Sequence, residues 1–325
     1  MKRALACMML LFASAVTAQT ASTGSGQAFP TKPVRLVATS TPGSPVDIYA
    51  RAIAEPLAKG LGQPVVVENR AGAGGTVAAG YVLGTEGDGH VTLVNTSAQI
   101  IAPFVYGGLA FDMLRDFVGV GPIIVLPNVL VVAPQRGWKS VQELVTAERA
   151  KPGAYSYGTG GSGTGTHVSA ERFRLAAGIT AVQVPYKGSP EVLIDIISGR
   201  IDWSVVPLST VLGQFKDGRL QVLALAAERR SPQVPELQTL TEAGLKDADF
   251  PFWVGMFVPA KTPRAARRRL YEETLKAMQQ ADVRDRLTKL GGEIVLMNPE
   301  EFDAYWKAQA DIAGTIVRTA NIKAN

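Results

Sequence analysis

Short runs of β-branched residues alternate with helix-like patterns along most of this chain, and this alternation constrains its fold more than any other feature. The strand candidates are residues 34–38, 65–67, 91–94, 129–132, 154–157, 181–184, 203–206, 222–226 and 253–258. The helix patterns between them include residues 48–61, 141–149, 168–177 and 192–198. Such alternation is typical of parallel sheets covered by helices, so the sequence predicts an α/β fold. Ligands of such sheets bind beyond the carboxyl ends of the strands.

A glycine-rich segment, residues 158–167, follows one of these strands and leads into a helix pattern that ends at Gly178. Glycines let the backbone turn tightly with its N–H groups directed inward. The first turn of the next helix adds unpaired N–H donors and a partial positive charge. This corner therefore favours an anion-binding loop, and a glycine turn without a ligand is the alternative.

Nucleotide binding is the first anion site to consider, because residues 158–163 spell G-x-G-x-x-G. That fingerprint also needs an acidic residue after the next strand, to hold the ribose. The next strand instead leads into Pro185-Tyr186-Lys187. A phosphate-binding loop of the G-x-x-x-x-G-K type fails as well, because Thr164 stands where its lysine should follow. The glycines alone do not indicate a nucleotide site.

Two corners in the first half of the chain carry similar polar residues. Ser44 reads as a helix N-cap with Pro45 at the first helical position, and Asp47 completes the pattern of a capping box. A cap and a ligand contact are equally good interpretations of Asp47. Asn95 and Ser97 follow another strand, where they either cap a helix or hydrogen-bond a small polar ligand.

Three further features each have a structural interpretation and a ligand-binding one. Lys187 precedes a Ser-Pro helix start and is either a solvated lysine or a charge for an anion. Residues 71–76 form another glycine turn, which we interpret as mainly structural. Asp202 stands between a helix and a strand, where it is a turn residue or faces the cleft.

The residues that catalysis would need do not form a recognisable set. The two histidines are His90, in a turn before a strand, and His167, which a packing or capping role suits better than a base role. The sequence has no H-E-x-x-H, C-x-x-C or G-x-S-x-G pattern, so neither a metal nor a catalytic serine is expected. Spacing alone leaves a triad of Ser162, His167 and Asp202 open, so a secreted hydrolase remains an alternative.

The N-terminal segment has the order of a secretory signal peptide. Lys2 and Arg3 precede an apolar run at 4–16, and small residues at 16–18 suit cleavage. We therefore expect a signal peptide at 1–18 and a flexible linker at 19–28. The single cysteine, Cys7, lies inside the signal, so the mature protein should contain no disulfide and no thiolate metal site.

The net charge of +5 is too small to indicate nucleic-acid binding, and no basic stripe with interleaved aromatic residues is present. The densest basic cluster, Arg264, Arg267, Arg268 and Arg269, lies in a helical pattern followed by glutamates. We interpret it as a solvated helix face.

Several long motifs of the chain are similar to one known family. They lie at residues 29–35, 42–47 with 50–51, 62–75, 158–167, 184–188, 199–202 and 241–244. In these segments, and over about 29–322 as a whole, the chain resembles the periplasmic solute receptors of tripartite tricarboxylate transporters, the Bug or TctC-like family.

The resemblance implies a two-lobed periplasmic-binding-protein-like fold with the ligand between the lobes. The first lobe would comprise 29–128 and 253–325, and the second 129–252. The implied function is a periplasmic receptor that closes on a small organic carboxylate, or on a related small amide or aromatic acid, and delivers it to membrane transporter subunits. We expect no enzymatic activity, no cofactor, no metal and no nucleic acid, and a monomer. A sensory receptor that reports occupancy to a signalling partner is an alternative.

The resemblance also implies the residues that contact the ligand. In the first lobe these are Ser44, Pro45, Asp47, Asn95 and Ser97. In the second lobe they are Ser162, Gly163, Thr164, Gly165, Thr166, His167 and Asp202.

This sequence departs from the family pattern at positions near the ligand. Ser44 replaces a usual glycine, Thr39 and Ser40 replace an apolar and often aromatic residue, and Trp203 replaces an aliphatic one. A carboxylate at Asp202 would repel an anion unless it meets a hydroxyl, an amine or water. We therefore expect Asp202 to bind the non-acidic end of the ligand or to order the loop.

Overall fold

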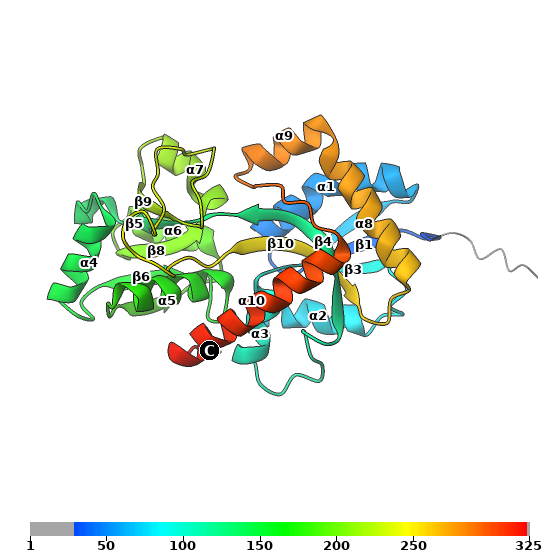
Figure 1. Cartoon of the computed structure of the whole chain (residues 1–325), viewed down its shortest axis with the longest axis horizontal. Helices are drawn as coiled ribbons and strands as arrows, with labels where there is room; N and C mark the ends of the chain where they lie inside the picture. Colours follow the sequence, from blue (N-terminus) through cyan, green and yellow to red (C-terminus); the bar gives the residue numbers. More distant parts are fainter. Residues whose placement is uncertain (1–28, 324–325) are drawn as a thin grey trace, which may run out of the picture.

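The computed structural model describes residues 29–323 of the chain (Figure 1). The expected signal peptide at 1–18 and linker at 19–28 lie outside the described residues. No helix within residues 29–323 combines the length and the apolar character needed to cross a bilayer.

The first five-stranded sheet of the described chain has the strand order β2-β1-β3-β10-β4. Its strands are β1 (Val34–Ala38), β2 (Val65–Asn69), β3 (Val91–Thr96), β4 (Phe117–Leu126) and β10 (Phe252–Pro259). Helices α1 (Pro45–Leu61), α8 (Arg264–Gln279) and α9 (Ala281–Lys289) cover one face. Helices α2 (Thr76–Leu83), α3 (Ala98–Val105) and α10 (Pro299–Thr319) cover the other.

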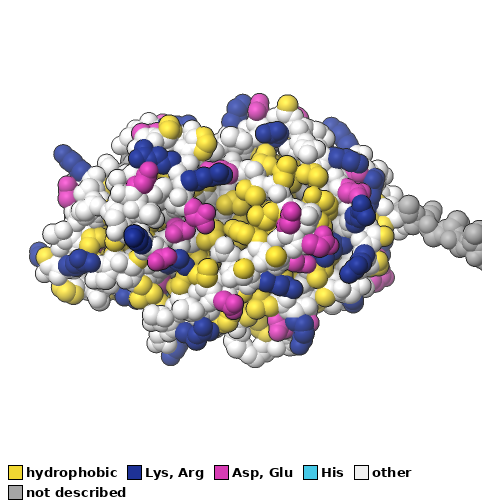
Figure 2. All heavy atoms as spheres, in the orientation of Figure 1, with side chains coloured by type: hydrophobic (Ala, Val, Ile, Leu, Met, Phe, Trp, Pro, Cys, Tyr) yellow, Lys and Arg dark blue, Asp and Glu magenta, His cyan; other side chains and the backbone are white. Residues whose placement is uncertain are grey.

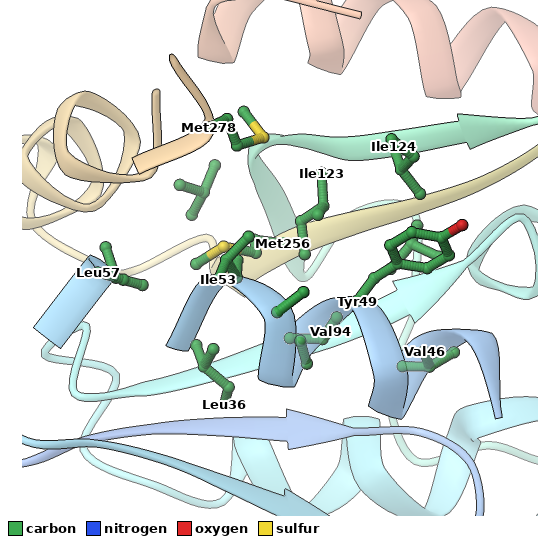
Figure 3. Close-up of a cluster of buried hydrophobic side chains, with 14 of the residues drawn as sticks. Leu36, Val46, Tyr49, Ile53, Leu57, Val94, Ile123, Ile124, Met256 and Met278 are labelled. Carbon is green, nitrogen blue, oxygen red and sulfur yellow. The ribbon is translucent and has the colours of Figure 1, made fainter. Parts of the chain in front are cut away.

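The core on the α1 face follows from the two periodicities of strand and helix. Val46, Tyr49, Ile53 and Leu57 recur every three or four residues along α1, so they share the side that meets the sheet (Figure 3). Leu36 of β1 packs against them, whereas its neighbour in sequence, residue 37, belongs to the opposite face. Truncating such a fully buried Leu or Ile to Ala costs about 2–5 kcal/mol.

The second five-stranded sheet of the described chain has the order β7-β6-β8-β5-β9. Its strands are β5 (Asn128–Val132), β6 (Ser156–Thr159), β7 (Val182–Pro185), β8 (Trp203–Pro207) and β9 (Gln221–Ala226). Helices α4 (Val141–Ala150) and α5 (Gly165–Ala177) pack on one face, and α6 (Ser189–Ile197) and α7 (Leu208–Lys216) on the other. Short 3₁₀ turns lie at Ala73–Gly75 (η1) and Pro134–Arg136 (η2).

Two strand connections join the halves of the molecule. Strand β4 runs through Pro127 directly into β5, and β10 brings the chain back into the first sheet (Figure 1). The α/β class is confirmed, but the prediction of parallel sheets is wrong in part. Strand β10 pairs antiparallel with β3 and β4, and β5 pairs antiparallel with β8 and β9. A strand that re-enters a sheet from the other lobe runs against its neighbours, so the crossovers make both sheets mixed.

The sequence pattern missed β4, and the strand expected at 154–157 lies at Ser156–Thr159. His90 has a structural role, because its buried ring accepts a hydrogen bond from the Thr31 N–H at 3.0 Å. The interpretation of the arginine cluster as a solvated helix face is wrong for Arg267. Its side chain is largely buried, and its guanidinium donates to the Gly119 and Pro299 carbonyls and to Asp303.

Basic and acidic side chains are interspersed over the face of the molecule that Figure 2 shows. On that face no large area of one sign is visible, which agrees with the small net charge. Pairs such as Arg268–Glu272, at 2.9 Å and one helical turn apart, contribute little stability but keep the surface charges mixed.

Candidate ligand-binding cleft

A cavity of about 1080 Å³ lies between the two sheets and receives residues from both. The first half contributes residues 39–46 and 71–75 with Thr96, Ala98, Tyr106 and Phe252. The second half contributes residues 160–162, 164–166 and 185–191 with Pro207, whereas the predicted contact Gly163 is not part of the wall. These segments follow the carboxyl ends of β1, β2, β3, β6, β7 and β8. The cavity therefore lies where an α/β fold is expected to bind a ligand.

Six helices of the described chain begin at this cavity: α1, α2, α3, α5, α6 and α7. The first N–H groups of a helix have no partner inside it, and its N-terminus has a partial positive charge. Among the described residues of the wall, Lys187 and Glu191 carry the charged side chains. Glu191 accepts the Lys187 backbone N–H at 3.1 Å, just before α6 begins. The resulting electrostatic environment favours an anion.

The glycine loop of the second half is held by its own polar side chains. Thr166 Oγ1 accepts the Gly160 N–H at 2.9 Å, and Thr164 Oγ1 donates to the Gly161 carbonyl at 2.7 Å. Thr164 is also the N-cap of α5. These contacts fix the loop in one conformation before a ligand arrives, which lowers the entropy cost of binding.

His167 supports the loop from behind rather than lining the cavity. Its buried Nδ1 accepts the Gly163 N–H at 3.1 Å. Burial lowers the pKa of His167 to about 4, while Glu171 acts in the opposite direction and Arg174 in the same one. The ring is therefore neutral at neutral pH, which leaves Nδ1 free to accept.

The corresponding loop of the first half is held by a carboxylate. Ser44 Oγ accepts the Asp47 N–H at 3.4 Å, and Asp47 Oδ2 accepts the Gly43 N–H at 2.9 Å. Asp47 Oδ1 also accepts from Arg51 Nε at 2.9 Å. Ser44 and Pro45 line the cavity. Asp47 is buried beneath the loop, which favours a capping role over a ligand contact.

Asn95 and Ser97 are fully buried next to the cavity, and their neighbours Thr96 and Ala98 form its wall. Asn95 Oδ1 accepts the Thr39 hydroxyl at 2.9 Å and so positions a wall residue. Ser97 packs against the start of α5. A direct ligand contact by either side chain stays a prediction that this arrangement does not favour.

Asp202 lies at the opposite end of β8 from the cavity. Its carboxylate pairs with Arg136 and accepts the Ser156 N–H at 2.6 Å. The structure thus gives Asp202 an ordering role at the amino end of the sheet and not a place in the cleft. Because Asp202 and His167 are engaged elsewhere, the structure does not bring them together with Ser162 as a triad.

The glycine loop makes two contacts with the α3 segment of the other lobe. The Tyr106 hydroxyl, at the end of α3, donates to the Ser162 carbonyl at 3.2 Å. Gly163 has φ of +71°, and a Cβ built on it would lie 2.6 Å from Cγ1 of Val105. The glycine loop is therefore pressed against α3 of the other lobe.

Sequence reasoning missed some residues of the wall. The glycine turn at 71–75 lines the cavity, and so does Lys187, for which a solvated role was the alternative. The glycine turn was recognised in the sequence, but it was interpreted as mainly structural. Tyr106 and Phe252 carried no sequence signal, because only the folded chain brings them to the cleft.

Comparison with known proteins identifies the family. Residues 49–322 match the family model of the tripartite tricarboxylate transporter family receptor, TctC. A UPF0065 protein from the tcbD-tcbE intergenic region of a Pseudomonas strain is 32% identical over 299 residues, 92% of this chain and 89% of the relative.

Two solved structures share the fold. R. palustris Rpa4515 with adipate is 29% identical, has a TM-score of 0.84, and the match covers 90% of this chain and 99% of that one. MatC from Rhodopseudomonas palustris with bound malate is 28% identical with a TM-score of 0.82, over 89% and 100% of the chains. The present chain belongs to the TctC family of tripartite tricarboxylate transporter receptors, which are two-lobed periplasmic solute-binding proteins.

Proposed function

We propose that this protein captures a small organic carboxylate by closure of its two lobes and delivers it to the membrane subunits of a tripartite transporter. The observation that carries the proposal is the convergence of helix N-termini from both halves on one cavity. A carboxylate held there would draw hydrogen bonds from both lobes and so favour the closed form over the open one. The adipate and malate bound to two structural relatives agree with this ligand class.

The proposed lobes are 29–128 with 253–325, and 129–252. The membership of the two sheets supports this division, because β1–β4 and β10 form one sheet and β5–β9 the other. The proposed location is the periplasm, as in the family, reached through the N-terminal signal. Intact-mass analysis of periplasmic protein should then find a chain that begins near Gln19.

We further propose that the ligand is released unchanged. The residues of a hydrolase would have to include a base near Ser162, and His167 instead accepts from a backbone N–H. Purified protein that consumed its carboxylate would contradict the receptor function.

A thermal-shift screen tests the proposal on protein that has been unfolded, freed of ligand and refolded. A carboxylate that binds the native state alone stabilises it by about 2.7 kcal/mol at a hundredfold excess over Kd. We expect at least one acid of a broad panel to raise Tm and to give a saturable calorimetric isotherm. A panel in which no acid raises Tm would contradict the proposal.

A further inference from the structure

Hydroxyl groups dominate the polar surface of the cavity. Its wall includes nine serines and threonines and two tyrosines, against two charged residues. A hydroxyl both donates and accepts hydrogen bonds, so it suits a ligand group that does the same.

Six of these hydroxyls have a proton available for a ligand. Ser44 Oγ and Thr96 Oγ1 each accept a backbone N–H, at 3.4 and 3.1 Å, and donate to no described residue. Ser40, Thr41, Ser162 and Ser189 make no side-chain hydrogen bond within residues 29–323. The six come from both lobes, so a ligand that used them would contact both.

The apolar part of the wall contains few large side chains. Phe252 and Val46 are its larger apolar side chains, and the remaining apolar lining within the described chain consists of alanines and prolines. An alkyl chain here would displace water from hydroxyls without replacing its hydrogen bonds. Leaving such groups unpaired costs more than burying a few methylenes gains.

We propose, on the basis of the receptor function above, that the preferred ligand is a polyhydroxylated carboxylate, that is, a sugar acid. Its carboxylate meets the helix N-termini and Lys187, and its hydroxyls pair with the six available side-chain hydroxyls. The cavity volume of about 1080 Å³ leaves room for such a ligand together with bridging water.

Matched pairs of acids test this class by calorimetry. Glucarate and adipate share one carbon chain and differ in hydroxyl groups, as do gluconate and hexanoate, and benzoate represents the aromatic acids. We expect the hydroxylated member of at least one pair to bind at least about tenfold more tightly, the effect of one net hydrogen bond. Tighter or equal binding of the member without hydroxyls in both pairs, or tighter binding of benzoate than of either hydroxylated acid, would overturn the ligand class while leaving the receptor function intact. Absence of binding by every acid of a broad panel would instead overturn the receptor function.

Variants in each lobe test whether the side-chain hydroxyls determine ligand selectivity. Thr41→Val and Ser162→Ala should each weaken glucarate binding by about three- to tenfold, and adipate binding by a smaller factor. Thr288→Val, at an exposed site on α9, is the matched control and should bind like the parent. The Tm of each variant without ligand checks that it folds. Equal losses for the two acids would show that the hydroxyls do not select the ligand.

Discussion

The two loops that face each other across the cleft have the same backbone requirement and different surroundings. Gly43 in the first lobe and Gly163 in the second both have positive φ, +80° and +71°. A Cβ on Gly43 would meet no atom within 4 Å, whereas one on Gly163 would meet Val105 of the other lobe at 2.6 Å.

From this difference we expect the first loop to contact the ligand alone and the second loop to take part in lobe closure as well. The first-lobe loop is ordered within its own lobe, by Asp47 and Ser44. The second-lobe loop contacts α3 through Gly163 and receives the Tyr106 hydroxyl on Ser162. Substitutions in the second loop should therefore affect lobe closure, and substitutions in the first should affect the ligand contact alone.

Gly163→Val should have the largest effect. The valine collides with Val105, so the lobes cannot close and ligand binding should fall below detection in calorimetry. Gly153→Val is the matched control, because Gly153 lies in the same lobe with φ of +74° and open space around its Cβ position. Both variants should lose about 1–3 kcal/mol of folding stability from backbone strain.

In this first test, the control should keep parental affinity and Gly43→Ala should bind with only modest loss. Parental affinity in Gly163→Val would mean that the glycine loop does not take part in closure. Loss of binding in Gly153→Val would mean that strain alone explains the effect.

Protonation of His167 should destabilise the second lobe at acidic pH. The folded-state pKa is about 4 against 6.5 for an unperturbed histidine, so between these values the unfolded chain binds more protons. The contribution of His167 to the free energy of unfolding is fully present above pH 6.5. It decreases by about 3 kcal/mol as the pH falls to 4.

Urea unfolding of the parent and of His167→Asn at several pH values measures this contribution. An asparagine carbonyl accepts the Gly163 N–H and does not titrate, so the variant should lose less stability between pH 6.5 and 4. His90 is common to both proteins and cancels in the difference. Parallel pH profiles would contradict the buried neutral imidazole.

Tyr106→Phe should weaken ligand binding by about tenfold, because one hydrogen bond across the cleft is lost. Tyr305→Phe on α10 is a matched control, since no described residue hydrogen-bonds its hydroxyl. We expect parental affinity for the control in calorimetry. Equal affinities for the parent and Tyr106→Phe would show that the Tyr106 hydroxyl does not contribute to lobe closure.

Ser44→Gly should have the smallest effect, because a glycine N-cap costs α1 only a few tenths of a kcal/mol. Binding should persist, and the rank order of acids in the screen should change, since one hydroxyl leaves the wall. An unchanged rank order would indicate that the Ser44 hydroxyl does not contribute to ligand selectivity.

Most strands could be predicted from the sequence because they are short segments rich in β-branched and other apolar residues. Strand β4 was missed because Gly119, Gly121 and Pro122 disfavour a strand pattern. In the fold Gly119 is needed, because Phe302 lies 2.5 Å from a Cβ built on it, and Tyr271 packs against Gly121. Such packing depends on residues far away in sequence, which local patterns do not contain.

The loops of the site could be predicted because their chemistry is local, as in the capping of α5 by Thr164. The sequence pattern left Asp202 as a turn residue or a cleft residue, and the resemblance favoured the cleft. A residue that begins a strand lies instead at the end of the sheet away from the ligand. Tyr106 could not be predicted, because its role arises only from the meeting of the two lobes.

The central claim is that an acid closes the two lobes. Spin labels on Val77→Cys of α2 and Ile194→Cys of α6 would measure this, since both side chains are exposed on helices that begin at the cleft, one in each lobe. Cys7 is the chain's single cysteine and precedes the described residues, so labelling of chain that starts at 29 is specific. With the tightest-binding acid of the panel, the distance between labels should shorten and its distribution should narrow, and Gly163→Val should show neither change. An unchanged distance distribution at a saturating acid concentration would contradict closure of the lobes on the ligand.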